Sequence, residues 1–113
     1  PEFNIDALRK RVMGNEPLVW RLLERFVELE SAGSALLRDL LANDRRDELQ
    51  RKAHSLRGAC ALLELTSVAR ACEKLESALA RSEPIEGLTF ELMAHLDAAI
   101  VVVRDVVENR RTR

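Results

Sequence analysis

The stretch DRRDELQRKAHSLRGACALL, residues 44–63, has the pattern of one amphipathic helix. Its apolar residues recur at spacings of four, three, four and three, which align them along one side of an α-helix. Such a side is buried against other helices, and Asn43 or Asp44 can cap the helix at its start. The residues of this predicted buried stripe are Leu49, Ala53, Leu56, Cys60 and Leu63.

Similar patterns fill the rest of the chain. The four glycines and three prolines are scarce, and most of them lie at breaks between periodic segments. Further helices are predicted over about 6–12, 17–41, 66–81 and 88–106. Long amphipathic helices with short connections indicate an all-α fold, an antiparallel up-down four-helix bundle with an additional short N-terminal helix across one end.

The expected buried stripe of the long helix over 17–41 follows its leucines. Trp20 falls off that stripe, where it could anchor the short first helix. The stripe expected to be buried on 17–41 is Leu18, Leu22, Phe26, Leu29, Gly33, Leu36 and Leu40. On 66–81 the expected stripe is Val68, Cys72, Leu75 and Leu79. On 88–106 it is Leu88, Leu92, Leu96, Ala99, Val103 and Val106.

Length and charge limit the classes of protein to which the chain can belong. Its 113 residues, 47% of them hydrophobic, suit one domain, which we place at 4–113. The formal charge of -1 gives no global positive field for nucleic acid or anionic lipid. No apolar run approaches the roughly 20 residues that span a bilayer, so we expect a cytoplasmic domain without membrane contact.

The first three residues, Pro1-Glu2-Phe3, resemble a remnant of a cloning vector, and no Met precedes Asn4. We therefore expect a module excised from a longer protein. Cys60 and Cys72 have no CxxC partner and no clustered histidines. They are interpreted as reduced core thiols, and no metal site is predicted.

His54 points away from the predicted core. At about 100° per residue, its side chain lies roughly 140° from the centre of the buried stripe of its helix. Gly58, one turn later, shares that outward face and costs about 1 kcal/mol of helix propensity relative to Ala, with no gain in core packing. A missing side chain beside the imidazole leaves space for another protein to approach, and Ala61, further along, is also small.

Two arginines flank the same histidine. Arg51 and Arg57 lie three residues before and after His54, and Gln50 lies four before it. A neutral imidazole is a nucleophile, and guanidinium groups stabilise phosphoryl oxygens. The sequence has no acidic cluster for the Mg²⁺ that such transfers use, so the metal and an acceptor aspartate would come from a partner. Taken alone, however, a surface histidine on a helix is more often simply solvated.

The motif Ala53-His54-Ser55-Leu56-Arg57-Gly58 resembles the phosphoacceptor motif A-H-x-L-K/R-G of histidine phosphotransfer (HPt) domains. The resemblance extends over residues 4–26 and to Leu75-Glu76, a pair common in the fourth helix of the family. It implies that His54 is phosphorylated, that Arg57 fills the usual Lys or Arg position, and that Gly58 gives clearance. Glu64, where many members have glycine, and Leu62, where many have a polar residue, put the choice of partner in doubt.

The resemblance implies a phosphorelay intermediate of a bacterial two-component system. His54 would accept a phosphoryl group from the aspartate of one receiver domain and pass it to the aspartate of a response regulator, with Mg²⁺ on the receiver. We expect the HPt module of a hybrid sensor histidine kinase, a monomer when isolated. Nothing in the sequence resembles an ATP-binding glycine-rich loop, so the domain itself is not expected to be an enzyme.

Two other functions stay open on the sequence. The phosphoacceptor domain of a chemotaxis-type kinase uses a similar bundle but receives its phosphoryl group from an ATP-binding domain. A helical interaction or dimerisation module would carry the histidine without using it. Leu62 could pack under the first helix or touch a partner.

Overall fold

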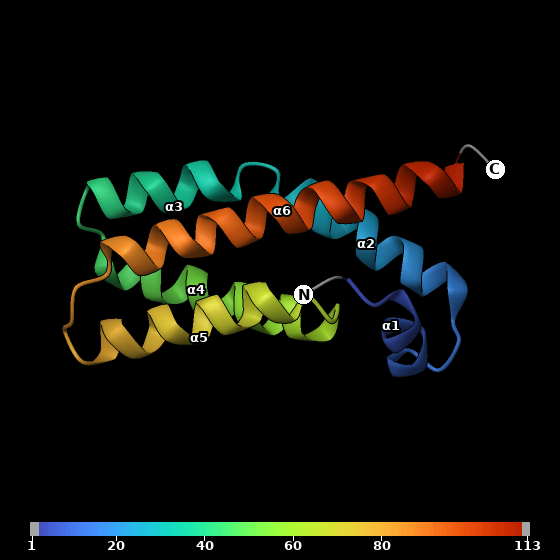
Figure 1. Cartoon of the computed structure of the whole chain (residues 1–113), viewed down its shortest axis with the longest axis horizontal. Helices are drawn as coiled ribbons and strands as arrows, with labels where there is room; N and C mark the ends of the chain where they lie inside the picture. Colours follow the sequence, from blue (N-terminus) through green and yellow to red (C-terminus); the bar gives the residue numbers. More distant parts are fainter. Residues whose placement is uncertain (1–2, 112–113) are drawn as a thin grey trace.

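The computed structural model describes residues 3–111, and every regular element in that range is an α-helix. The all-α prediction is confirmed, with six helices described where five were expected (Figure 1). The expected vector remnant falls largely outside the described residues, since only Phe3 of the three is described. The helices are α1 (Ile5–Arg11), α2 (Glu16–Glu30), α3 (Gly33–Ala42), α4 (Arg46–Leu62), α5 (Thr66–Ala80) and α6 (Glu86–Arg111).

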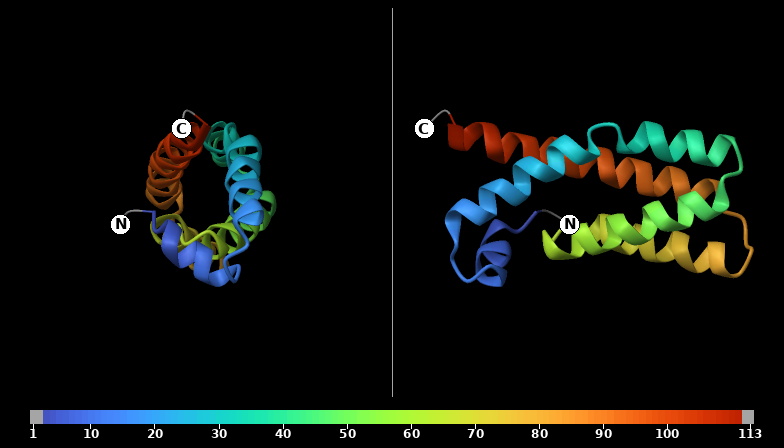
Figure 2. Two further views of the ribbon diagram at one scale, coloured as in Figure 1. Left: turned by 90° about the vertical axis from the view of Figure 1, so that its right-hand side faces the viewer. Right: turned by 180° about the vertical axis from the view of Figure 1, so that it is seen from behind.

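The helices form an up-down bundle in which α2 and α3 together make the first of four antiparallel rods. Helices α2 and α3 run together along one side, and α4, α5 and α6 follow in alternating directions (Figures 1 and 2). The long helix α6 packs against α2, α3 and α5, and α4 packs against α3 and α5. Helix α1 lies at one end of the bundle, as predicted. No helix among residues 3–111 is long and apolar enough to cross a membrane.

The predicted single helix over 17–41 is wrong, because a turn at Ser31 and Ala32 divides it into α2 and α3. Gly33 begins α3 at a very close approach to α6. A Cβ atom placed there would lie 2.7 Å from Leu96 Cδ2 and 3.0 Å from Glu30 Oε1. Because Gly33 has no side chain, α3 approaches α6 more closely here than a helix with a larger residue at this position could.

The buried stripe predicted for this segment was shifted by one residue over much of its length. Leu29 and Leu36 are 59% and 43% exposed, whereas Trp20, expected off the stripe, belongs to the core. Both sets of residues are built from helical spacings of three and four, and only the packing chooses between them. Phe26, Gly33 and Leu40 are common to both sets. The set that is buried is Val19, Leu23, Phe26, Glu30, Gly33, Leu37 and Leu40.

Glu30 explains why the leucine pattern was misleading. Its side chain is buried in the stripe, and its Oε1 lies 2.6 Å from Nζ of Lys52 on α4, with the two side chains only 11% and 19% exposed. A buried carboxylate is tolerated when a cation pairs with it. The pattern of one helix cannot reveal a partner on another.

The stripe predicted on 44–63 is confirmed, since all five of its residues are buried. On α5 and α6 the predicted stripes are also right, with Leu79, Leu88, Ala99 and Val106 partly rather than fully buried. Cys60 and Cys72 are buried free thiols. Burial raises the pKa of the Cys72 thiol to about 12 and raises the pKa of Cys60 as well, so both stay protonated at neutral pH.

The ends of α3, α4 and α5 share one geometry. Asp44, Glu64 and Ser82 each take a left-handed backbone conformation, with φ of 53°, 62° and 57°. In each case the N–H of the next residue donates to the carbonyl five residues before it. Asn43 and Asp44 therefore end α3 rather than cap α4 as predicted. The Asn43 side chain donates to the carbonyl of Asp39 at 2.8 Å.

Candidate functional site

His54 lies in the middle of α4 with its ring in solvent. Ala53 and Leu56 on either side of it are buried in the core, while the His54 side chain is 67% exposed. The helix period thus sends the ring away from the bundle, as the sequence predicted. An exposed imidazole on a rigid helix is accessible to another protein.

A glutamate from the next helix holds the ring. Glu76 on α5 places Oε2 3.1 Å from His54 Nδ1, and its other oxygen, Oε1, accepts a hydrogen bond of 2.7 Å from Nε of Arg57. Nη2 of Arg57 also lies 3.2 Å from His54 Nδ1. The Glu76 side chain is only 15% exposed. His54, Arg57 and Glu76 are hereafter called the histidine triad.

The triad distinguishes the two ring nitrogens. Nδ1 faces both the carboxylate and the guanidinium, whereas Nε2 forms no hydrogen bond or ion pair with the part of the chain that the structure describes. Arg57 makes its shorter bond to Oε1 of Glu76, which leaves the second carboxylate oxygen to accept a hydrogen bond from a protonated Nδ1. A neutral imidazole with its proton on Nδ1 has a free lone pair on Nε2. The geometry therefore favours Nε2 as the nucleophilic atom.

Glu76 is a site residue that the pattern of the sequence did not predict. The pair Leu75-Glu76 was noted only as part of the family resemblance. A signal was present, because the stripe on α5 buries Leu75 and so directs its neighbour to the edge of that helix. Predicting the contact would have required the rotation of α5 relative to α4, which the pattern of a single helix does not give.

Gly58 and Ala61 lie on the exposed face of α4 with His54, as predicted. A Cβ atom added at Gly58 would meet nothing within 4 Å. Close packing inside the domain therefore does not require a glycine here, although glycine weakens the helix. The open space beside the ring is consistent with the clearance that the sequence indicated.

Arg51 and Gln50 occupy the preceding turn, on the same side of α4 as His54. Arg51 is exposed and forms no ion pair with the described residues. Gln50 is partly buried, and its Oε1 atom is buried without a hydrogen-bond partner in residues 3–111. Arg51 and Arg57, which lie three residues before and after His54 in the sequence, thus have different surroundings in the structure.

A shallow apolar groove borders this face. Leu62, 39% exposed, lines it together with residues of α2, including the exposed Leu29. The structure thus places Leu62 beside α2 and partly open to solvent. The apolar residues of this groove, called the α2–α4 groove, are Leu22, Phe26, Leu29, Ala59, Leu62 and Leu63.

Glu64, where many HPt domains have glycine, has a structural role here. Its φ of 62° lies in the region that glycine adopts most easily. Its carboxylate accepts bonds of 3.1 and 3.0 Å from Nε and Nη2 of Arg11. Glu64 therefore ties α1 to the end of α4.

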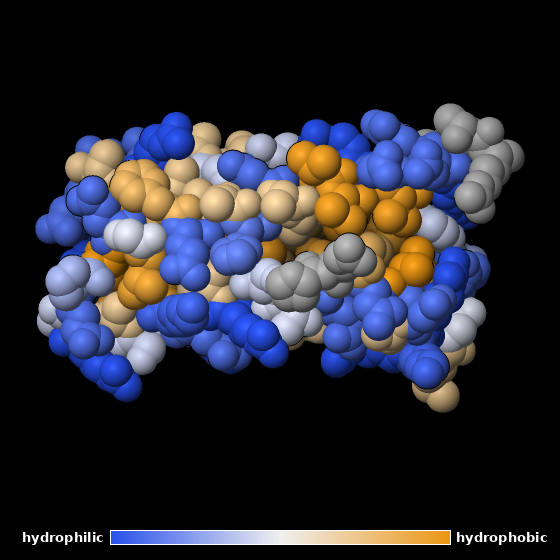
Figure 3. Space-filling model, in the orientation of Figure 1, coloured by the Kyte–Doolittle hydropathy of each residue, from blue (hydrophilic) through white to orange (hydrophobic). Residues whose placement is uncertain are grey.

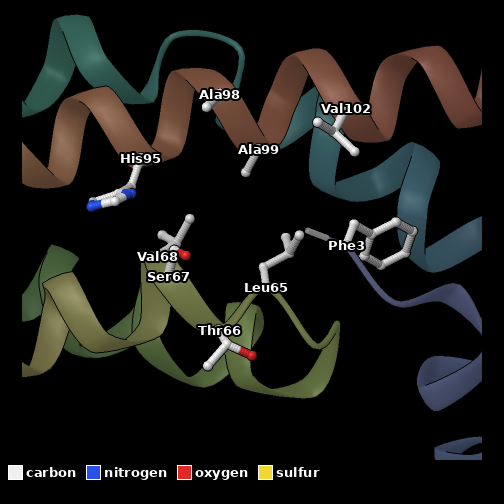
Figure 4. A pocket seen from close by; sticks show the side chains of 9 residues that line it. All are labelled: Phe3, Leu65, Thr66, Ser67, Val68, His95, Ala98, Ala99 and Val102. Carbon is white, nitrogen blue, oxygen red and sulfur yellow. The ribbon is translucent and has the colours of Figure 1, made fainter. Parts of the chain in front are cut away.

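A second hollow lies between the start of α5 and the middle of α6 (Figure 4). Leu65, Val68 and Val102 line it, with the His95 ring at one end and Phe3 at the other. On this face the surface is apolar over the C-terminal half of α6, where Val101 is 65% exposed (Figure 3). In the described part of the chain, no three His, Cys, Asp or Glu side chains come together as a metal site would require.

The comparisons with known proteins agree with this geometry. The family model of the Hpt domain matches residues 21–106, about three quarters of the chain. The chain belongs to the Hpt family. As an HPt domain it is a phosphorelay intermediate, and its family consists of phosphocarriers rather than catalysts.

A solved structure has the same fold. The HPT domain of a sensor hybrid histidine kinase from Shewanella matches with a TM-score of 0.86 and 21% sequence identity, covering 95% of this chain and 94% of that one. At this identity the likeness establishes the four-helix architecture with its additional N-terminal helix. No curated protein is significantly similar in sequence.

Replacing Glu76 with Gln should change the tautomer of His54. The carboxylate that accepts the hydrogen bond from Nδ1–H is lost, and a hydrogen bond to a charged group at a partly exposed position contributes about 1 kcal/mol. We expect the ratio of Nδ1–H to Nε2–H tautomers to fall several-fold, measured by ¹⁵N chemical shifts of the ring. Glu73→Gln, at an exposed glutamate of the same helix, is the control. An unchanged tautomer ratio in Glu76→Gln would contradict this assignment.

Proposed function

We propose that the domain carries a phosphoryl group on Nε2 of His54. The group comes from the aspartate of one receiver domain and passes to the aspartate of a response regulator. The observation that supports this most strongly is the exposed ring whose Nδ1 is held by Glu76 and whose Nε2 is free. Phosphotransfer through an imidazole needs one nitrogen as nucleophile and the other held in place.

Transfer of the phosphoryl group from the receiver aspartate to Nε2 needs no base from this chain. The Nε2 lone pair forms the N–P bond while the P–O bond to the receiver aspartate breaks, and its electron pair remains on the aspartate oxygen. The proton stays on Nδ1, where the Glu76 carboxylate stabilises the positive charge that the ring acquires. In the reverse step the lone pair returns to Nε2, so the same contact serves both directions. Mg²⁺ would be supplied by the receiver domain.

The receiver would approach over Gly58 and Ala61. Both lack a long side chain, so a second protein surface can come close to the ring. The α2–α4 groove beside them offers exposed apolar area from Leu29 and Leu62 that a receiver could cover. Because the partner differs between HPt domains, Leu62 and Glu64 are candidates for its selection. A monomeric state, a cytoplasmic location, and membership of a hybrid sensor kinase remain predictions.

Replacing His54 with Gln should abolish labelling. We would incubate the domain with a ³²P-phosphorylated receiver and measure label on the domain that is stable in alkali and labile in acid. Wild type should take the label and His54→Gln should take none. His95→Gln serves as the control, because this histidine lies beside α5 and is not part of the histidine triad. The His95→Gln variant should take as much label as wild type.

The donor distinguishes the remaining alternatives. Labelling by an ATP-bound kinase domain but by no receiver would favour the chemotaxis-type phosphoacceptor. Equal labelling of wild type and His54→Gln would contradict His54 as the phosphorylated residue. No label on either variant from any receiver of the source organism would indicate that the domain is a helical interaction module.

Replacing Gly58 with Leu should raise the stability of the domain but slow phosphoryl transfer. Leucine has a higher helix propensity than glycine, and the Cβ enters open space, so the free energy of unfolding should rise by up to about 1 kcal/mol. The side chain would obstruct the partner, and the transfer rate constant should fall about tenfold or more, which corresponds to about 1.4 kcal/mol in the barrier.

Gly87→Leu is the matched control, since Gly87 is also an exposed helical glycine whose Cβ would meet nothing within 4 Å. It lies in the first turn of α6, on another helix from His54. Its transfer rate should equal that of wild type. A Gly58→Leu domain that is folded and transfers at the wild-type rate would show that Gly58 gives no clearance.

A further inference from the structure

We propose that Arg51, rather than Arg57, is the cationic side chain that contacts the phosphoryl group during transfer. Arg57 is then a positioning residue that acts through Glu76. This assignment rests on the phosphorelay function proposed above, and it gives different tasks to two arginines that are symmetrical about His54 in the sequence.

Arg57 is already occupied. Its Nε donates to Glu76 at 2.7 Å, and its Nη2 lies 3.2 Å from His54 Nδ1, so its guanidinium is directed at the side of the ring opposite the free nitrogen. Moving it to a phosphoryl group would leave the Glu76 carboxylate, 15% exposed, without its cation. Removing the cation from a largely buried carboxylate is costly, because the remaining charge stays partly desolvated.

Arg51 has no such commitment. It is exposed and forms no ion pair with residues 3–111, so using it breaks no described contact. Side chains on an α-helix lean toward its N-terminus, and the ring of His54 therefore covers the turn that contains Arg51. Arg57 leans back toward His54 for the same reason, which explains why it reaches Nδ1. At about 100° per residue, Arg51 and Arg57 lie about 60° to either side of His54 around α4, so Arg51 is on the side away from Arg57 and its partner Glu76.

This placement suits the transfer step. As the N–P bond forms on Nε2 and the P–O bond to the receiver aspartate breaks, the negative charge is spread over three phosphoryl oxygens. A guanidinium can donate two hydrogen bonds to them. Arg51 can follow the phosphoryl group in either direction while the triad keeps the ring fixed.

The test measures single-turnover transfer from a phosphorylated receiver to the domain over a range of receiver concentrations. Arg51→Gln should lower the maximal rate constant about tenfold, with an unchanged melting temperature and an unchanged His54 tautomer ratio. Arg51→Lys should recover part of that loss, because it restores a cation without the planar fork. Arg57→Gln should instead shift the tautomer ratio. Arg38→Gln, at an exposed arginine one turn after Ser34 on α3, controls for the lost charge and should match wild type.

Two results would overturn the assignment. The first is a wild-type maximal rate in Arg51→Gln, or a change only in the receiver concentration at half-saturation, which would make Arg51 a docking contact. The second is a loss in Arg57→Gln equal to or larger than that in Arg51→Gln with an unchanged tautomer. A wild-type domain that takes no label would instead overturn the phosphorelay function, and this proposal with it.

Discussion

The contact between Glu76 on α5 and the ring of His54 on α4 is the interaction on which the rest of the site depends. Without it, no carboxylate would hold a proton on Nδ1 of this exposed side chain. With it, Nδ1 is engaged at 3.1 Å and Nε2 is left to react. The same carboxylate binds Arg57, so one partly buried charge sets the orientation of both of its neighbours on α4. The exposed position of the ring and its fixed orientation thus have separate causes, namely the helix period and the neighbouring helix.

The bundle supplies the rigidity that this contact needs. Leu56 and Cys60 on α4 pack in the same core as Cys72 and Leu75 on α5, so the two helices cannot slide without disturbing buried side chains. On another side of α4, Lys52 pairs with Glu30 of α2. Two ion pairs therefore connect α4 to its neighbours on either side of the reactive histidine, and both are shielded more than ordinary surface pairs. Arg51 and Gly58, which join neither pair, are left on the open face, where a partner would meet them.

The sequence predicted the helices, the α4 stripe and the outward direction of His54, because these depend on the period of one helix. It failed where two helices meet. The turn at Ser31 lies just before Gly33, where α3 closely approaches Leu96 of α6, and the true stripe of α2 contains a glutamate that is acceptable only beside Lys52. Glu76 was missed for the same reason. The difference between Arg51 and Arg57 is likewise set by a residue on another helix, although both lie three positions from His54.

The central claim is that Nε2 of His54 carries the phosphoryl group. The measurement that tests it most directly is a two-bond ¹H–¹⁵N correlation spectrum of the ring, recorded with ³¹P coupling, on the domain phosphorylated by a receiver. The account predicts phosphorus bonded to Nε2 and a proton on Nδ1. Phosphorus bonded to Nδ1 would contradict it, because Glu76 and Arg57 could not then hold the ring as the structure shows.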